Sequence, residues 1–213
     1  MLISFDYLFN KYNIQPDGVL HLGANTGQEA EAYHRHGIKQ VIWVEALPDL
    51  FHRLEQNVKQ FPGHRSLCAC VSDTDGKEVP FFVASNGGQS SSFLKFGTHE
   101  QEHPSVHFTR QVNMVTVRVD TLLKEKGIQL EGNGWFLNAD LQGAELLALK
   151  GMGDLLWKFE HAYIEVNTRE LYVGCPFVGE IDAYLRDFGF QGMETKMTSF
   201  GWGDKYYKRF LKV

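Results

Sequence analysis

Two glycines and one acid have the types and spacing of a ligand site. Gly23 and Gly27 end the run VLHLGANTG over residues 19–27, and Glu45 ends a second apolar run about twenty residues later. Glycine adopts backbone angles that other residues resist, and free amides at a helix N-terminus attract negative charge. A carboxylate at the tip of the second strand can accept hydrogen bonds from both hydroxyls of a ribose. The two stretches therefore fit the two ends of a nucleoside-like ligand.

The glycine spacing also indicates which class of ligand the turn can bind. A dinucleotide site prefers Gly-x-Gly-x-x-Gly, whereas residues 23–27 read GANTG with no third glycine in register. This favours a ligand with one ribose and no pyrophosphate, such as S-adenosyl-L-methionine, and it disfavours nicotinamide-dependent oxidoreduction. An ordinary glycine-containing turn between a strand and a helix is the alternative interpretation.

The elements that must position these residues alternate along the chain. Apolar runs and helical periodicity predict a repeated strand–helix pattern, and this pattern is typical of an α/β fold with a mostly parallel sheet and helices on both faces. The expected strands are residues 19–22, 40–45, 65–71, 135–139 and 159–166, and the expected helices are residues 27–36, 48–61, 144–150 (stopped by Gly151) and 177–188.

Two regions depart from this alternation. In the middle of the chain we expect extra strands over residues 78–84 and 111–119, and a short helix with Asp120 as its N-cap. At the end, residues 190–197 and 205–213 predict an antiparallel hairpin that adds an edge to the sheet.

Length and composition predict one domain. Residues 1–17 are expected to form an N-terminal helical cap, and residues 18–213 a single domain with a lid or substrate segment at 85–110. A formal charge of −5 gives no basic surface for nucleic acid, and no stretch approaches the length of a membrane span. Three cysteines and no visible secretion signal suggest a cytoplasmic protein with reduced thiols. The oligomeric state is left open.

Polar residues gather where the expected strands end. In a parallel sheet the carboxyl ends of the strands meet at one edge, and ligands bind there at the point where strand order reverses. His161, near the start of its strand, is expected at the opposite edge. The residues expected at the binding edge are Gly23–Gly27, Glu45, Ser72, Asp73, Asp140, Leu141, Gln142, Glu165 and Asn167.

One block carries a resemblance to a known family. Residues 140–151, DLQGAELLALKG, closely resemble the Asp-x-(Glu/Gln)-Gly-Ala-Glu…Leu-Lys-Gly signature of FkbM-type methyltransferases. The GANTG turn, the Ser72-Asp73-x-x-Gly76 turn, the Ser90–Ser92 loop and Glu165 with the downstream Tyr172 are similar to other landmarks of that family. The resemblance covers residues 18 to the C-terminus. His21 departs from it, because the family often has Asp at this position.

The resemblance implies a class I methyltransferase (Rossmann-like) fold with S-adenosyl-L-methionine as methyl donor. Asp140 would face the sulfonium or the amino group and is the candidate catalytic residue. Ser90, Ser91, Gln142, Glu165 and Asn167 are the candidate substrate residues. The candidate cofactor residues are Gly23, Ala24, Asn25 and Gly27 for the methionine portion, Glu45 and Ala46 for the ribose, Ser72 and Asp73 for the adenine, and Asp140 with Leu141.

The family precedent points to O-methylation of a hydroxyl on a sugar, glycan or secondary metabolite. A hydroxyl acceptor benefits from a base, and Asp140 or a histidine of residues 93–110 are the candidates. The alternative function is a non-catalytic module that retains the nucleoside pocket. Acceptor identity cannot be read from the sequence.

Five further residues have structural interpretations. His21 is expected to be a hydrogen-bonded core histidine. Glu145 is expected to be a first-turn carboxylate favoured by the helix dipole, without direct chemistry. His99, His103 and His107 recur every fourth residue, but Pro104 interrupts the pattern, so we expect lid surface and no metal ligands. A magnesium ion held by Asp140, Glu165 and Asn167 is a minority hypothesis.

Overall fold

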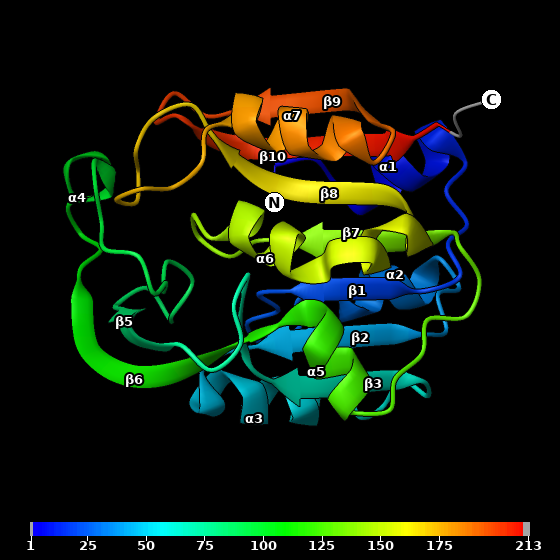
Figure 1. The fold of residues 1–213 in the computed structure, drawn as a ribbon, viewed down its shortest axis with the longest axis horizontal. Helices are drawn as coiled ribbons and strands as arrows, with labels where there is room; N and C mark the ends of the chain where they lie inside the picture. Colours follow the sequence, from blue (N-terminus) through cyan, green and yellow to red (C-terminus); the bar gives the residue numbers. More distant parts are fainter. Residues whose placement is uncertain (1, 211–213) are drawn as a thin grey trace.

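The computed structural model describes residues 2–210 and contains a seven-stranded sheet in the order β3-β2-β1-β7-β8-β10-β9 (Figure 1). Strands β3, β2, β1, β7 and β8 are mutually parallel, and β10 is antiparallel to both of its neighbours. The predicted α/β architecture is confirmed. The strands are β1 (Val19–Leu22), β2 (Val41–Glu45), β3 (His64–Cys68), β7 (Trp135–Ala139), β8 (Phe159–Asn167), β9 (Phe190–Met197) and β10 (Trp202–Arg209).

Helices cover both faces of this sheet. In Figure 1, α5, α6 and α7 lie in front of the strands, and α1 and α2 lie behind them. The helices are α1 (Phe5–Tyr12), α2 (Ala30–Arg35), α3 (Pro48–Val58), α4 (His99–Glu102), α5 (Val119–Glu125), α6 (Glu145–Met152) and α7 (Val178–Asp187), with a 3₁₀ segment at Gly153–Lys158.

The period-two pattern of the strands produces the two apolar layers. In β1, Leu20 and Leu22 pack into the core under α5, α6 and α7, whereas Val19 packs into the core under α1, α2 and α3. Successive side chains of a strand point to opposite faces, so strands buried on both faces read as continuous apolar runs. Helix α1, expected as a cap, contributes Phe5 and Phe9 to the second core.

A second, three-stranded sheet has the order β4-β6-β5. It comprises β4 (Cys70–Ser72), β5 (Glu78–Ala84) and β6 (Phe108–Arg118). The single strand predicted over residues 65–71 is therefore wrong, because the chain changes sheets at Ala69. The Ala69 amide still donates to the Glu45 carbonyl, and Cys70 then pairs with Thr116 of β6.

Several element ends differ from the predictions, and three of these differences have a cause in the backbone or its contacts. Helix α2 begins at Ala30 because Gly27 has a φ of +76° and cannot be helical. The N-cap of α5 is Arg118, and Asp120 lies in the first turn, where it pairs with that arginine. Helix α6 continues through Gly151, where a Cβ would lie 2.0 Å from the Ser72 carbonyl oxygen, so this glycine allows close packing rather than ending the helix.

The predicted C-terminal hairpin is confirmed, and it adds an antiparallel edge to the sheet. Strand β10 lies between β8 and β9, so β9 forms the edge. It begins at Trp202, before the expected start, and residues 211–213 of the predicted strand lie outside the described residues. No helix within residues 2–210 has the length and apolar character needed to cross a bilayer.

A buried polar network joins β1, α2 and β7. The Tyr33 hydroxyl lies 3.2 Å from His21 Nδ1 and accepts a 2.9 Å hydrogen bond from Asn138 Nδ2. Burial lowers the pKa of His21 to about 3, so its ring is neutral at physiological pH. His21 is 3% exposed and hydrogen-bonded, in agreement with the predicted core histidine.

We expect Tyr33→Phe to lower the free energy of unfolding by ~1–3 kcal/mol, because it leaves buried polar groups without a partner. Urea unfolding monitored by circular dichroism measures the change. Tyr7→Phe is the matched control, since Tyr7 is 47% exposed, and its effect should stay within ~0.5 kcal/mol. Equal stabilities of the two variants would contradict the assigned network.

Candidate functional site

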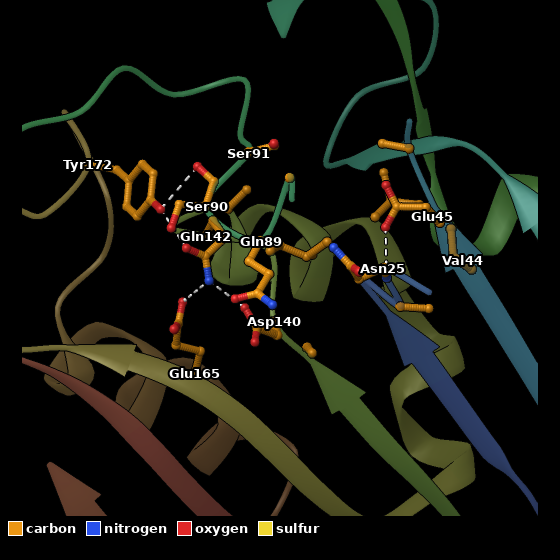
Figure 2. Close-up of a pocket in the computed structure, with 18 of the residues that line it drawn as sticks. Asn25, Val44, Glu45, Gln89, Ser90, Ser91, Asp140, Gln142, Glu165 and Tyr172 are labelled. Atoms are coloured by element: carbon orange, nitrogen blue, oxygen red, sulfur yellow. Dashed lines mark hydrogen bonds between the residues drawn. The ribbon is translucent and has the colours of Figure 1, made fainter. Parts of the chain in front are cut away.

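A cavity of about 510 Å³ opens at the carboxyl ends of the parallel strands. Its floor is formed by the ends of β1, β2, β7 and β8, and Ser90 and Ser91 cover it from the loop after β5 (Figure 2). The order of the strands reverses between β1 and β7, which is where an open α/β sheet forms its ligand crevice. The volume is within the usual range for small-molecule sites.

The turn after β1 depends on a close approach of two backbones. Gly23 has a φ of +81°, and a Cβ on it would lie 1.8 Å from the Asp140 carbonyl oxygen. The amides of Gly23 and Ala24 donate to the Val44 carbonyl at 2.9 and 3.0 Å. Asn25 then adopts a φ of 46°, which turns the chain across the cavity mouth. A residue with a side chain at position 23 would separate β1 from β7.

Glu45 at the end of β2 is held by backbone amides. Its Oε2 accepts from Asn25 N at 2.9 Å and its Oε1 accepts from Leu47 N at 2.8 Å. Burial raises the pKa of this carboxyl to about 7 even though both amides favour the ionised form. Each carboxylate oxygen retains a further lone pair, so the fixed group can accept two more hydrogen bonds.

Gln142 connects the acids on the other side of the cavity (Figure 2). Its Nε2 donates to Asp140 Oδ1 at 2.6 Å and to Glu165 Oε2 at 2.9 Å, and its Oε1 accepts from the Tyr172 hydroxyl. That hydroxyl also lies 3.3 Å from the Ser90 carbonyl. One neutral amide therefore links two strand ends to the covering loop.

The lining is acidic. Within residues 2–210 no lysine or arginine lines the cavity. Burial raises the pKa of Asp140 and Glu29 to about 6 and about 7, and it also raises that of Glu165. Such a cavity favours a ligand that brings positive charge. The lining acids are Glu29, Glu45, Asp140, Glu165 and Asp204.

The structure brings most of the predicted site residues together. The predicted residues that line the cavity are Gly23, Ala24, Asn25, Glu45, Ala46, Asp140 and Leu141 from the cofactor set, and Ser90, Ser91, Gln142, Glu165 and Asn167 from the substrate set. Gly27 does not line the cavity, because its α-carbon faces Leu54 in the core. Ser72 and Asp73 are also outside the lining, which on β4 ends at Val71.

The apolar wall beside Glu45 was not predicted. It is formed by Ala69, Cys70 and Val71, which come immediately before Ser72. These residues contact the cavity because the chain crosses from one sheet to the other there. A continuous apolar run in the sequence gave no signal for this crossing.

The histidines predicted as lid surface divide into two groups. His99 and His103 line the cavity, whereas His107 is exposed and does not. Helix α4 ends at Glu102, so the three imidazoles do not share a helix face. The His99 ring stacks on Phe96 at 4.1 Å, and burial lowers the pKa of His99 to about 4.

These features fit the chemistry of S-adenosyl-L-methionine. Glu45 presents a fixed carboxylate for a diol, and the wall at residues 69–71 is apolar enough for a flat base. Asp140 and Glu29 place negative charge at the opposite end, where a cationic sulfonium and ammonium require it. The residues present therefore suit this donor.

Comparison with known proteins identifies the family. A family model described as the Methyltransferase FkbM domain matches residues 21–191, most of the chain. The chain belongs to the FkbM methyltransferase family. The methyl donor of an FkbM methyltransferase is S-adenosyl-L-methionine, so the resemblance and the cofactor predicted from the sequence are confirmed.

Individual relatives are more distant. The FkbM chain is 27% identical over 168 residues to the 2-O-methyltransferase NoeI of Sinorhizobium fredii (strain NBRC 101917 / NGR234), covering 75% of this chain and 68% of the relative. The fold is similar to that of magnesium protoporphyrin IX methyltransferase from Synechocystis PCC 6803, with a TM-score of 0.53, 11% identity and coverage of 96% and 76% of the two chains. This likeness shows the class I methyltransferase fold.

We expect Gly23→Ala to abolish donor binding and to destabilise the fold by ~3 kcal/mol or more, because its Cβ would collide with the Asp140 carbonyl. Gly37→Ala is a matched control, since Gly37 has a φ of +72° and a Cβ there meets nothing within 4 Å. The control should cost only ~1 kcal/mol from backbone strain. Chemical denaturation and calorimetry with the donor measure both effects, and equal losses in the two variants would contradict the proposed strand contact.

Proposed function

We propose that this FkbM methyltransferase transfers a methyl group to a hydroxyl oxygen of a sugar, glycan or secondary metabolite. The similarity to a 2-O-methyltransferase over three quarters of the chain supports O-methylation. The side chains beside Asp140 support a hydroxylated acceptor. Ser90, Ser91, Gln142 and Tyr172 there offer hydroxyl and amide groups that can pair with acceptor hydroxyls.

The acidic lining of the cavity is the observation that best supports an uncharged acceptor. Its described lining holds five acids and no lysine or arginine, so an acceptor with a phosphate or carboxylate would be repelled. An uncharged polyol has no such cost. The formal charge of −5 for the whole chain adds to the repulsion of polyanions.

The proposed mechanism assigns a role to each part of the cavity. S-adenosyl-L-methionine supplies a methyl group already activated by its positive sulfur. Glu45 would hold the ribose hydroxyls, and Asp140, the candidate catalytic residue, would face the charged end of the donor. As the acceptor oxygen bonds to the methyl group and the bond between methyl and sulfur breaks, the hydroxyl proton would pass to Asp140 or to a lining histidine, His99 or His103, and the demethylated donor would leave. Gln142 fixes the Asp140 carboxylate, and Ser90 and Ser91 reduce access of water. The side chains mainly hold the two reactants in line, which makes the transfer effectively intramolecular.

Donor affinity should fall as the pH is lowered through about 7, because protonation of Glu45 removes an acceptor for the ribose. Asp140 is the charged group that faces Glu45 and raises its pKa further, whereas the amides of Asn25 and Leu47 lower it. We expect about a tenfold loss of affinity between pH 8 and pH 5.5 in calorimetry. Glu45→Gln should bind more weakly at pH 8 and lose less affinity between the two values, the remaining loss coming from Glu29 and Asp140, whose pKa values of about 7 and about 6 lie in the same range. The same pH dependence in the variant would show that another group is responsible.

Acceptor charge gives a second test. With a labelled donor, a neutral hexose or its glycoside should be methylated at least tenfold faster than the corresponding uronic acid, which differs by one carboxylate. Equal or faster transfer to the acid would contradict the proposed acceptor class. Tight donor binding without transfer to any hydroxylated acceptor would favour the non-catalytic module.

A further inference from the structure

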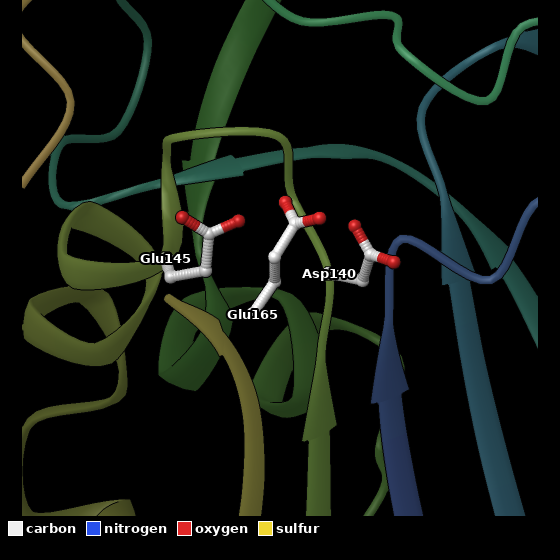
Figure 3. Close-up of side chains that lie close together, drawn as sticks. All are labelled: Asp140, Glu145 and Glu165. Atoms are coloured by element: carbon white, nitrogen blue, oxygen red, sulfur yellow. The ribbon is translucent and has the colours of Figure 1, made fainter. Parts of the chain in front are cut away.

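Three carboxylates from three different elements lie close together at the carboxyl ends of β7 and β8. Asp140 follows β7, Glu145 is the first residue of α6, and Glu165 lies near the end of β8. One oxygen from each lies within 4.8 Å of the other two. Figure 3 shows the three carboxyl groups side by side, with Glu165 between the others. From the sequence alone, Glu145 is expected only as a carboxylate in the first turn of a helix.

The spacing of these oxygens suits a hard divalent cation. Calcium–oxygen bonds are ~2.4 Å, so ligands on opposite sides of a calcium ion lie ~4.8 Å apart. Magnesium and manganese have shorter bonds and would draw the three groups together by a few tenths of an ångström. Carboxylate oxygens are the ligands that such cations prefer.

Two further observations point to a missing ligand. Glu145 is completely buried; its Oε1 accepts from the amides of Leu141 and Gly143, but its Oε2 has no hydrogen-bond partner. Asn167 is 1% exposed, and neither Oδ1 nor Nδ2 has a partner in the described chain. Asn167 is two residues beyond Glu165 on β8 and lines the same cavity, so its side chain lies on the same face of the strand. Buried polar atoms normally have partners.

The protein supplies little to offset the charge of the cluster. Gln142 Nε2 donates to both Asp140 and Glu165, but an amide is neutral. No lysine or arginine of the described chain lines the cavity. The two buried carboxyls, Glu145 and Glu165, beside half-buried Asp140, must then hold protons or a cation, since an uncompensated buried charge is costly.

We propose that Asp140, Glu145 and Glu165 bind a hard divalent cation, with Asn167 Oδ1 as a further oxygen ligand. This cation site does not rest on the proposed function.

The test uses the full chain, stripped with a chelator and titrated by calorimetry with CaCl₂, MgCl₂ and MnCl₂. We expect one cation per chain, and at least tenfold weaker binding in Glu165→Gln and Glu145→Gln. Glu45→Gln is the matched control, because it removes a buried acid of the same cavity outside the cluster and should leave cation affinity unchanged. Circular dichroism checks that each variant is folded.

A second readout separates this proposal from the function. Mn²⁺ bound at the site gives an electron paramagnetic resonance signal that requires neither donor nor acceptor, and Glu165→Gln should lose it. No binding at 10 mM of any of the three cations would overturn the proposal, as would unchanged binding in both folded cluster variants. If the donor's ammonium is the natural partner instead, cation binding is absent while both variants bind the donor at least tenfold more weakly. Cation binding without methyl transfer would overturn the proposed function but leave the site.

Discussion

The contact between the ends of β1 and β7 is the constraint on which the site depends. Gly23 lets the backbone of one strand lie against the Asp140 carbonyl of the next, so the floor of the cavity closes at the point where strand order reverses. The neighbouring strand ends that line the cavity are positioned by their pairing with β1 and β7. Glu45 is one strand away on one side, and Glu165 is one strand away on the other. Moving these two strands apart would separate Asp140 from Glu45 across the cavity.

Several carboxyl groups lie at or beside the cavity in surroundings that disfavour their ionised forms. Burial raises the pKa of Glu45 and Glu145 to about 7 and that of Asp140 to about 6. Each raised pKa means that the folded state disfavours the ionised form of the group. These carboxyls therefore lower the free energy of unfolding as the pH rises from their pKa in the unfolded chain through their pKa in the folded protein. A bound ligand with positive charge favours the ionised carboxylates and so opposes this loss of stability. Binding and stability are therefore coupled through the same side chains.

Much of this arrangement was predictable from local sequence. The continuous apolar runs of β1, β2 and β7 and the block from Asp140 to Gly151 predicted the strands and one wall of the cavity, because an apolar run and the turn that ends it are signals within a short stretch of sequence. The change of sheet at Ala69 was not predictable. It depends on pairing between Cys70 and Thr116, which are far apart in the chain. The position of β10 inside the sheet has the same origin, since hairpin patterns do not reveal which strand lies at the edge.

Backbone strain is concentrated at the same cavity. Among the described residues, those other than glycine with a positive φ are Asn13, Asn25 and Gln142. Asn25 and Gln142 both line the cavity, one beside Glu45 and the other beside Asp140. Asparagine tolerates this conformation, but glutamine adopts it at a cost of order 1–3 kcal/mol. That cost places the Gln142 amide between Asp140 and Glu165, with its carbonyl toward Tyr172. A relaxed backbone at position 142 would point this side chain elsewhere and leave the two acids without their common donor.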